Sequence, residues 1–82
     1  MISIEKIIEH FRDGREIELS VMGREYFMQP NYDVESDSYI IYDCDRKENV
    51  FCGEIEEVLD YKFEGDISLR ANLEIFDFKY IL

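Results

Sequence analysis

The chain has 82 residues, of which 46% are hydrophobic and 35% charged, and its formal net charge is -11. This length predicts a single domain over residues 1–82, and the apolar content is too high for a disordered acidic tail. The excess of 20 acidic over 9 basic residues disfavours direct binding to nucleic acid and to anionic membranes, because both rely on Lys and Arg. We expect neither a signal peptide nor a membrane span, since Met1 leads almost directly into a charged helix and no apolar run approaches about 20 residues. The protein is therefore expected in the cytoplasm.

The N-terminal segment predicts an amphipathic helix over about Ile4–Asp13. Its isoleucines and Phe11 recur at helical spacing and form one apolar stripe. Ser3 is placed to cap the first turn, and Gly14 supplies the left-handed position that commonly ends a helix. We expect this stripe to lie across one face of a sheet.

Residues 15–30, REIELSVMGREYFMQP, predict a β-hairpin in which apolar and polar residues alternate along both arms. Successive side chains of a strand point to opposite faces, so one face collects the apolar set. A slip of one residue would turn the apolar side chains of one arm towards water, so the pattern predicts the register as well as the strands. With Met22-Gly23 as the turn, the predicted pairs are Val21 with Arg24, Leu19 with Tyr26, and Ile17 with Met28.

A second hairpin is predicted from Ser38–Cys44 and Asn49–Cys52, joined by a polar turn. With Cys44 opposite Asn49, Tyr42 pairs with Phe51. The two cysteines then lie on opposite faces of the sheet, and we expect free thiols that pack as small hydrophobic residues.

The remaining segments predict a second helix and a last strand. Apolar residues at helical spacing follow Gly53 and continue to about Phe63. Ser68 is placed to cap one short turn, and residues 73–82 alternate as a strand. The fold class is therefore α+β, with a mostly antiparallel sheet of about five strands, two helices and the order α-β-β-β-β-α-β.

No catalytic residue, metal or cofactor is predicted. His10 is the single histidine, and one histidine without a nearby partner does not define an acid-base or metal site. Residues 33–37 resemble the opening of a calcium loop, but Ser38 and Cys44 stand where such a loop needs Gly and a bidentate Glu. Asp43 and Asp45 would need a third carboxylate to hold magnesium.

The strongest functional signal is the distribution of charge. Residues 33–66 carry 12 acids and 3 bases, which leaves -9, whereas the other 48 residues carry 8 acids and 6 bases, which leaves -2. This concentration costs self-repulsion and adds nothing to the core, so we interpret it as a surface for a basic partner or, alternatively, as a solubility feature. Tyrosines beside the acids would anchor Arg-rich surfaces. The predicted partner-binding residues are Tyr32, Asp33, Glu35, Asp37, Tyr39, Glu54, Glu56, Glu57 and Asp60.

The segments REIELSVMGREYFMQP and SYIIYDCDRKENVFCGEIEEVLDYKFEGDISL carry a resemblance that spans most of the chain. The chain resembles small acidic proteins of unknown function from bacteria and their phages, which share a helix, a G-[KR]-E-I-E hairpin, a Tyr-Ile-Tyr-Asp strand and a closing helix before a D-G-[KS] turn. Residues 14–18 and 39–43 match, whereas Glu64-Gly65-Asp66 departs from the closing turn. In general character the chain is also similar to anti-CRISPR and toxin-immunity proteins, which are often short, acidic and non-enzymatic. The resemblance implies a fold and transfers no catalytic residue.

We therefore expect a non-enzymatic binding protein that inhibits a basic partner, a nuclease or another nucleic-acid-binding protein. Its acidic stretch would occupy a groove that otherwise holds DNA or RNA. Three alternatives stay open: an immunity protein that neutralises a toxin, a metal-dependent hydrolase built on Asp43 and Asp45, and a structural subunit that forms a homodimer through an apolar outer sheet face.

Overall fold

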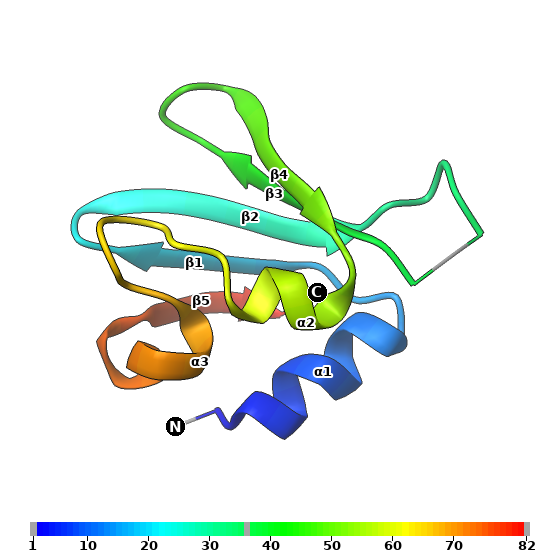
Figure 1. Cartoon of the computed structure of the whole chain (residues 1–82), viewed down its shortest axis with the longest axis horizontal. Coiled ribbons are helices and arrows are strands. Elements are labelled where there is room, and N and C mark those ends of the chain that lie inside the picture. The colour runs from blue at the N-terminus through cyan, green and yellow to red at the C-terminus, as the bar shows by residue number, and fades with distance from the viewer. Residues whose placement is uncertain (1, 36, 82) are drawn as a thin grey trace.

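A computed structural model describes residues 2–35 and 37–81, the last two by their backbone alone (Figure 1). Five antiparallel strands form one sheet in the order β4-β3-β2-β1-β5. The strands are β1 (Ile17–Val21), β2 (Arg24–Pro30), β3 (Tyr39–Asp43), β4 (Glu48–Gly53) and β5 (Asp77–Ile81). The helices are α1 (Ile4–Arg12), α2 (Ile55–Leu59), α3 (Leu69–Asn72) and the 3₁₀ turn η1 (Leu73–Ile75). The predicted α+β class is confirmed, and the element order matches apart from the additional short helices.

The core lies between the helices and one face of the sheet, because the strands turn their apolar positions to the same side. Burial alternates along β1 and β3 with a period of two residues. Ile7 and Phe11 of α1 and Val58 and Leu59 of α2 are almost fully buried against this face. None of the helices in the described ranges is long and apolar enough to cross a membrane.

The first helix and the first hairpin are confirmed. The Ser3 hydroxyl accepts a hydrogen bond from the Lys6 amide at 3.2 Å, and Gly14 has the predicted positive φ of 78°. All three predicted cross-strand pairs of the hairpin occur. Their apolar side chains are all buried, as the alternation requires: Ile17, Leu19, Val21, Tyr26 and Met28.

The turn of this hairpin contains a residue in an unfavourable backbone conformation. Met22 and Gly23 have φ values of 53° and 76°, the combination that a two-residue type I′ turn requires. Glycine adopts this region freely and asparagine tolerates it, whereas other L-residues pay about 1–2 kcal/mol. The Met22 side chain is 65% exposed, so little packing offsets this penalty.

We therefore expect Met22→Asn to raise the free energy of unfolding by about 0.5–1 kcal/mol. The measurement is the urea midpoint at an unchanged slope. Met22→Val is the matched control, because a β-branched residue suits this conformation least and should lower the midpoint. A Met22→Asn midpoint at or below that of the parent protein would contradict the expectation.

The register of the second hairpin differs from the prediction. Ile41 lies opposite Phe51, and a bulge then shifts Tyr42 to face Asn49, whereas the sequence pattern predicts that Tyr42 pairs with Phe51. The shift follows from the turn, in which the Lys47 amide donates to the Asp43 carbonyl at 2.7 Å. Lys47 itself adopts a left-handed φ of 57°. This turn closes the ladder at Asp43 and Glu48, one residue earlier on each strand than predicted.

The new register also changes the placement of the cysteines. Cys52 lies opposite Ile40, and Cys44 follows two residues after Tyr42, so both cysteines belong to the sheet face away from α1 and α2. The prediction of opposite faces is wrong, whereas the prediction of free thiols is confirmed. Burial raises the pKa of the Cys44 thiol, and the nearby Glu25 carboxylate raises it further.

The second helix is shorter than predicted, because the residues of its predicted last turn make tertiary contacts instead of helical hydrogen bonds. It ends at Leu59 instead of Phe63, and the Phe63 amide donates to the Ile67 carbonyl at 2.9 Å. The Phe63 ring lies between Tyr26 and Phe76, with centroid distances of 4.9 and 5.1 Å. Burying this ring in the core draws the chain away from the helix axis.

The C-terminal third combines one confirmed and one corrected element. The Ser68 hydroxyl accepts a hydrogen bond from the Ala71 amide at 3.2 Å and caps α3, as predicted. The last strand begins only at Asp77, because residues 73–75 form η1. A bulge then shifts β5 against β1, which places Tyr80 opposite Glu18.

Candidate functional site

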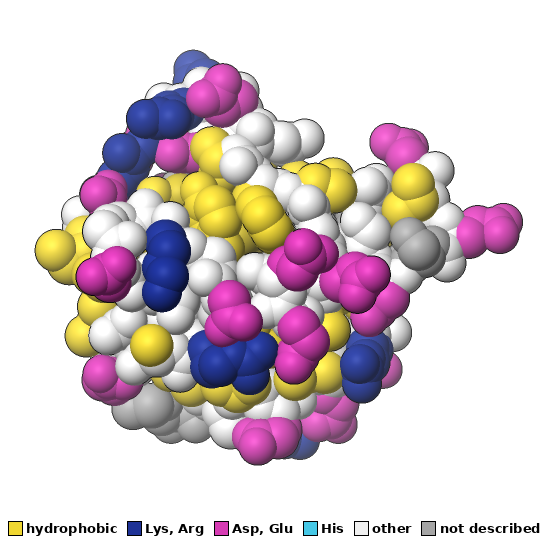
Figure 2. Space-filling model, viewed as in Figure 1, with side chains coloured by type: hydrophobic (Ala, Val, Ile, Leu, Met, Phe, Trp, Pro, Cys, Tyr) yellow, Lys and Arg dark blue, Asp and Glu magenta, His cyan; other side chains and the backbone are white. Residues whose placement is uncertain are grey.

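The structure brings the end of the first acidic segment next to the start of the second. Tyr39 at the start of β3 pairs with Gly53 at the end of β4, so the loop of residues 31–38 ends beside the start of α2. Figure 2 shows acidic side chains over α2 and along this protruding loop. We call this region the acidic surface; its carboxylates are all exposed and comprise Asp33, Glu35, Asp37, Glu54, Glu56, Glu57 and Asp60.

The loop is held against the C-terminal end of α1. The Tyr32 hydroxyl donates to the Gly14 carbonyl at 3.3 Å, and the Asp33 amide donates to the Asn31 side chain at 3.2 Å. Tyr32 and Val34 remain 66% and 45% exposed. Tyr32 therefore has the exposure that the predicted anchor role requires.

Tyr39 does not have this exposure. It is 4% exposed, and its ring centroid lies 4.9 Å from that of Phe11 in the core. Its hydroxyl donates a hydrogen bond to the Asp37 carboxylate. Burial, together with this hydrogen bond, raises the pKa of Tyr39 to about 12. Tyr39 is therefore a core residue that orients Asp37, and its ring is not available as the surface anchor that the sequence suggested.

The carboxylates of α2 have different local partners. Glu57 accepts a hydrogen bond from the Glu54 amide at 2.9 Å and so stabilises the first turn. Arg70 of α3 donates to Asp60 at 2.7 Å and to Glu56 at 3.1 Å. These two hydrogen bonds raise the pKa of Arg70 above its ordinary value. Arg70 thus neutralises part of the acidic surface.

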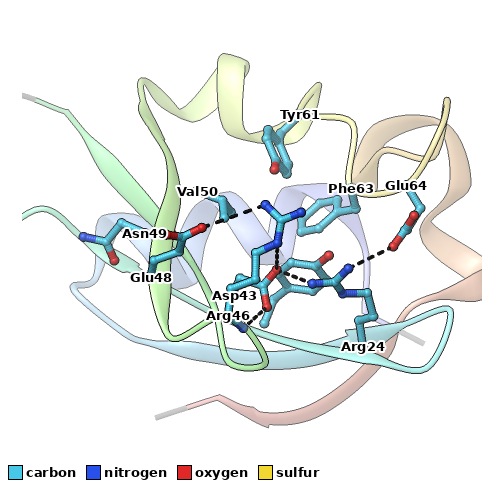
Figure 3. A pocket seen from close by; sticks show the side chains of 10 residues that line it. Arg24, Asp43, Arg46, Glu48, Asn49, Val50, Tyr61, Phe63 and Glu64 are labelled. Carbon is cyan, nitrogen blue, oxygen red and sulfur yellow. Dashed lines mark hydrogen bonds and ion pairs between the residues drawn. The ribbon is translucent and has the colours of Figure 1, made fainter.

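A second site lies at the turn between β3 and β4, around Asp43, which the sequence presents only as a possible magnesium ligand together with Asp45 (Figure 3). Asp43 is 2% exposed, and its Oδ2 accepts a hydrogen bond from Arg24 Nη2 at 2.7 Å. Its Oδ1 accepts from the amides of Asp45 and Arg46 at 2.9 and 3.0 Å. Both carboxylate oxygens are therefore in use, which removes support from the alternative of a magnesium site on Asp43 and Asp45.

Asp43 and Arg24 form the floor of an open cleft of about 460 Å³. Arg46 lies at its mouth, where Figure 3 shows the guanidinium between the Asp43 carboxylate and the Tyr61 ring. Aromatic rings and carboxylates from both sides complete the lining. We call this region the cleft; it is lined by Arg24, Tyr26, Asp43, Arg46, Glu48, Asn49, Val50, Tyr61, Phe63 and Glu64.

A signal for this site was present in the sequence pattern. In the first hairpin Arg24 shares its face with Tyr26 and Met28, and in β3 Asp43 shares its face with Ile41. A charged residue on the core face of a strand is expected to find an opposite charge, because unpaired buried charges are costly. Two such residues of opposite sign therefore indicated an ion pair.

Two sites of different chemistry thus lie on the helix side of the sheet, an exposed acidic surface and a cleft that combines aromatic rings with both signs of charge. In the described residues, no group of three or more His, Cys, Asp or Glu side chains is placed to hold a metal ion. Comparison of this chain with models of protein families, with curated proteins and with solved structures finds no match.

Proposed function

We propose that the protein is a non-enzymatic binding protein whose acidic surface occupies the basic groove of a nucleic-acid-handling partner and so inhibits it. The observation that carries this proposal is the pairing of Tyr39 with Gly53, which joins the acidic loop to α2. Seven carboxylates, together with the guanidinium groups of Arg70 and of Arg12, which lies beside Glu35 and Asp37, leave about -5 on this surface out of the net charge of -11. The acids are thus concentrated in space as well as in sequence.

Electrostatic complementarity explains how such a surface would select its partner. A field of one sign raises the rate of association with an oppositely charged groove and disfavours partners of like charge. The exposed ring of Tyr32 adds an aromatic contact at the edge of the acids. A groove filled in this way has no room for a nucleic acid backbone, and inhibition follows from competition.

The test removes acids from the loop without changing the fold. We expect Asp33→Asn/Glu35→Gln/Asp37→Asn to weaken binding to the partner about tenfold at low salt, because the surface loses three charges. The partner is sought by presenting the immobilised protein to heparin-binding proteins from a lysate. Retention is measured at about 50 and about 300 mM salt, where screening differs strongly. Duplex DNA is added as a competitor, and the captured protein is assayed for its own activity on nucleic acid.

The control variant is Glu5→Gln/Glu74→Gln/Asp77→Asn, which removes three exposed acids elsewhere and changes the net charge equally. It should retain binding within about twofold if the location of the charge matters. Equal weakening by both triple variants, retention independent of salt, or a partner that DNA does not displace would each overturn the proposal.

A further inference from the structure

We propose that the cleft is a pocket for a single arginine side chain of the partner. This inference rests on the proposed function and assigns one specific contact within it. The contact differs from general attraction to the acidic surface, because it requires a guanidinium and depends on different residues.

The side chains that line the cleft carry one more negative charge than positive charges. Asp43, Glu48 and Glu64 contribute three carboxylates, and Arg24 and Arg46 contribute two guanidinium groups. This balance of -1, which becomes -2 without Arg46, favours a cationic ligand and disfavours an anionic one such as phosphate. The acidic field of the whole chain adds to this preference.

Two of the three carboxylates have only long ion pairs. Glu48 Oε1 lies 3.9 Å from Arg46 Nη1, and Glu64 Oε1 lies 3.6 Å from Arg24 Nη1, both beyond the charge-assisted hydrogen bond of about 2.7–2.9 Å. Their side chains are 58% and 41% exposed. Both therefore retain acceptor oxygens for an incoming guanidinium, whereas Asp43 is buried and already accepts three hydrogen bonds.

The aromatic wall of the cleft suits a planar cation. Tyr61 and Phe63 meet edge to face, with centroids 5.0 Å apart and planes at 85°. A guanidinium stacks on an aromatic face while its edge donates to carboxylates, a combination that the ammonium of lysine does not reproduce. Glu48 and Glu64 flank this wall in Figure 3.

The protein's own Arg46 shows that a guanidinium fits at this position. Its group lies beside Tyr61, yet the side chain is 62% exposed and its ion pairs with Asp43 and Glu48 measure 4.0 and 3.9 Å. A long exposed side chain held this weakly is readily displaced. We infer that Arg46 occupies the position of the partner's arginine in the free protein. Arg46 moves aside when the partner's arginine binds.

The test uses a hexa-arginine peptide and a hexa-lysine peptide as probes, followed by the amide and aromatic NMR signals of the full chain. The arginine peptide is expected to shift the signals of Tyr61, Phe63 and Glu64, and the lysine peptide to leave them nearly unchanged. Glu48→Gln/Glu64→Gln is expected to weaken the arginine-specific binding about tenfold. Tyr61→Leu should reduce the preference for arginine over lysine, and dispersed amide spectra verify that each variant is folded.

The matched control is Glu5→Gln/Glu74→Gln, which removes two acids away from the cleft. Equal weakening by this variant, equal shifts with both peptides, or shifts confined to the acidic surface would each overturn the inference. Different results would contradict the proposed function and the arginine pocket. Loss of partner binding in the loop variant alone supports the acidic surface without the cleft, and arginine-specific shifts that persist in the loop variant support the cleft alone.

Discussion

Phe63→Ala is expected to lower the free energy of unfolding by about 3–5 kcal/mol, the range for deletion of a buried aromatic ring. Phe63 is 7% exposed and contacts three other rings, with centroids 4.9–5.1 Å away. Alanine would leave a cavity at the point where the segment after α2 joins the sheet. A domain of this size has a total stability of roughly 4–12 kcal/mol, so the variant should be partly unfolded at 37 °C.

The measurement is chemical denaturation of parent and variants at one temperature. Phe63→Leu, which keeps most of the volume, should cost less than about 1.5 kcal/mol. Tyr32→Ala is the exposed aromatic control and should change stability by at most about 0.5 kcal/mol. If Phe63→Ala behaved like Tyr32→Ala, the aromatic cluster would not be the element that ends α2.

Asp43→Ala is expected to lower the free energy of unfolding by about 2–4 kcal/mol, because a buried acceptor with several charge-assisted hydrogen bonds is lost. Two amides of the β3–β4 turn lose their acceptor, and the guanidinium of Arg24 loses its closest partner. Asp43→Asn keeps an oxygen for the turn amides and removes only the charge. We expect the free energy of unfolding of Asp43→Asn to lie between those of Asp43→Ala and the parent protein.

The control for Asp43→Ala is Asp45→Asn, since the side chain of Asp45 is 58% exposed and its ion pair with Arg24 measures 3.7 Å. Such an exposed pair contributes little, so the midpoint should barely move. The double variant Arg24→Met/Asp43→Leu replaces the ion pair with apolar side chains. It tests whether the ion pair stabilises the protein more than apolar side chains in the same place. Recovery of parent stability in this variant would indicate that the pair is needed for specificity or binding and not for stability. An Asp43→Ala midpoint equal to that of Asp45→Asn would contradict the structural role of Asp43.

These two residues connect stability to the proposed contact with arginine. Phe63 supplies part of the aromatic wall of the cleft, and Asp43 holds the turn that carries Arg46 and Glu48. Their replacement should therefore abolish arginine-specific binding through loss of the cleft. For this reason Glu48, Glu64 and Tyr61, which are more exposed, are the residues to vary in binding experiments.

The first hairpin could be predicted in full, whereas the second could not, and the difference is physical. In the first, strict alternation and a two-residue Met22-Gly23 turn leave one register that buries the apolar face. In the second, the turn depends on the side chain of Asp43, which accepts hydrogen bonds from the two amides after Cys44, and beside this turn the pairing is shifted by two residues, so that Tyr42 faces Asn49 instead of Phe51. Alternation alone does not report such a side-chain contact.

The sequence by itself determined the α+β class, the first helix with its Ser3 cap, the register of the first hairpin and the concentration of acids in residues 33–66. All of these depend on periodicity, capping and composition, which act between near neighbours. Only the tertiary structure decided that Tyr39 is buried, that α2 ends at Leu59 and that the second hairpin closes with Asp43 opposite Glu48. It also decided that the acidic loop ends beside the start of α2. Each of these outcomes depends on how distant strands align and on which rings and charges the core can accommodate, and those energies exist only after the chain has folded.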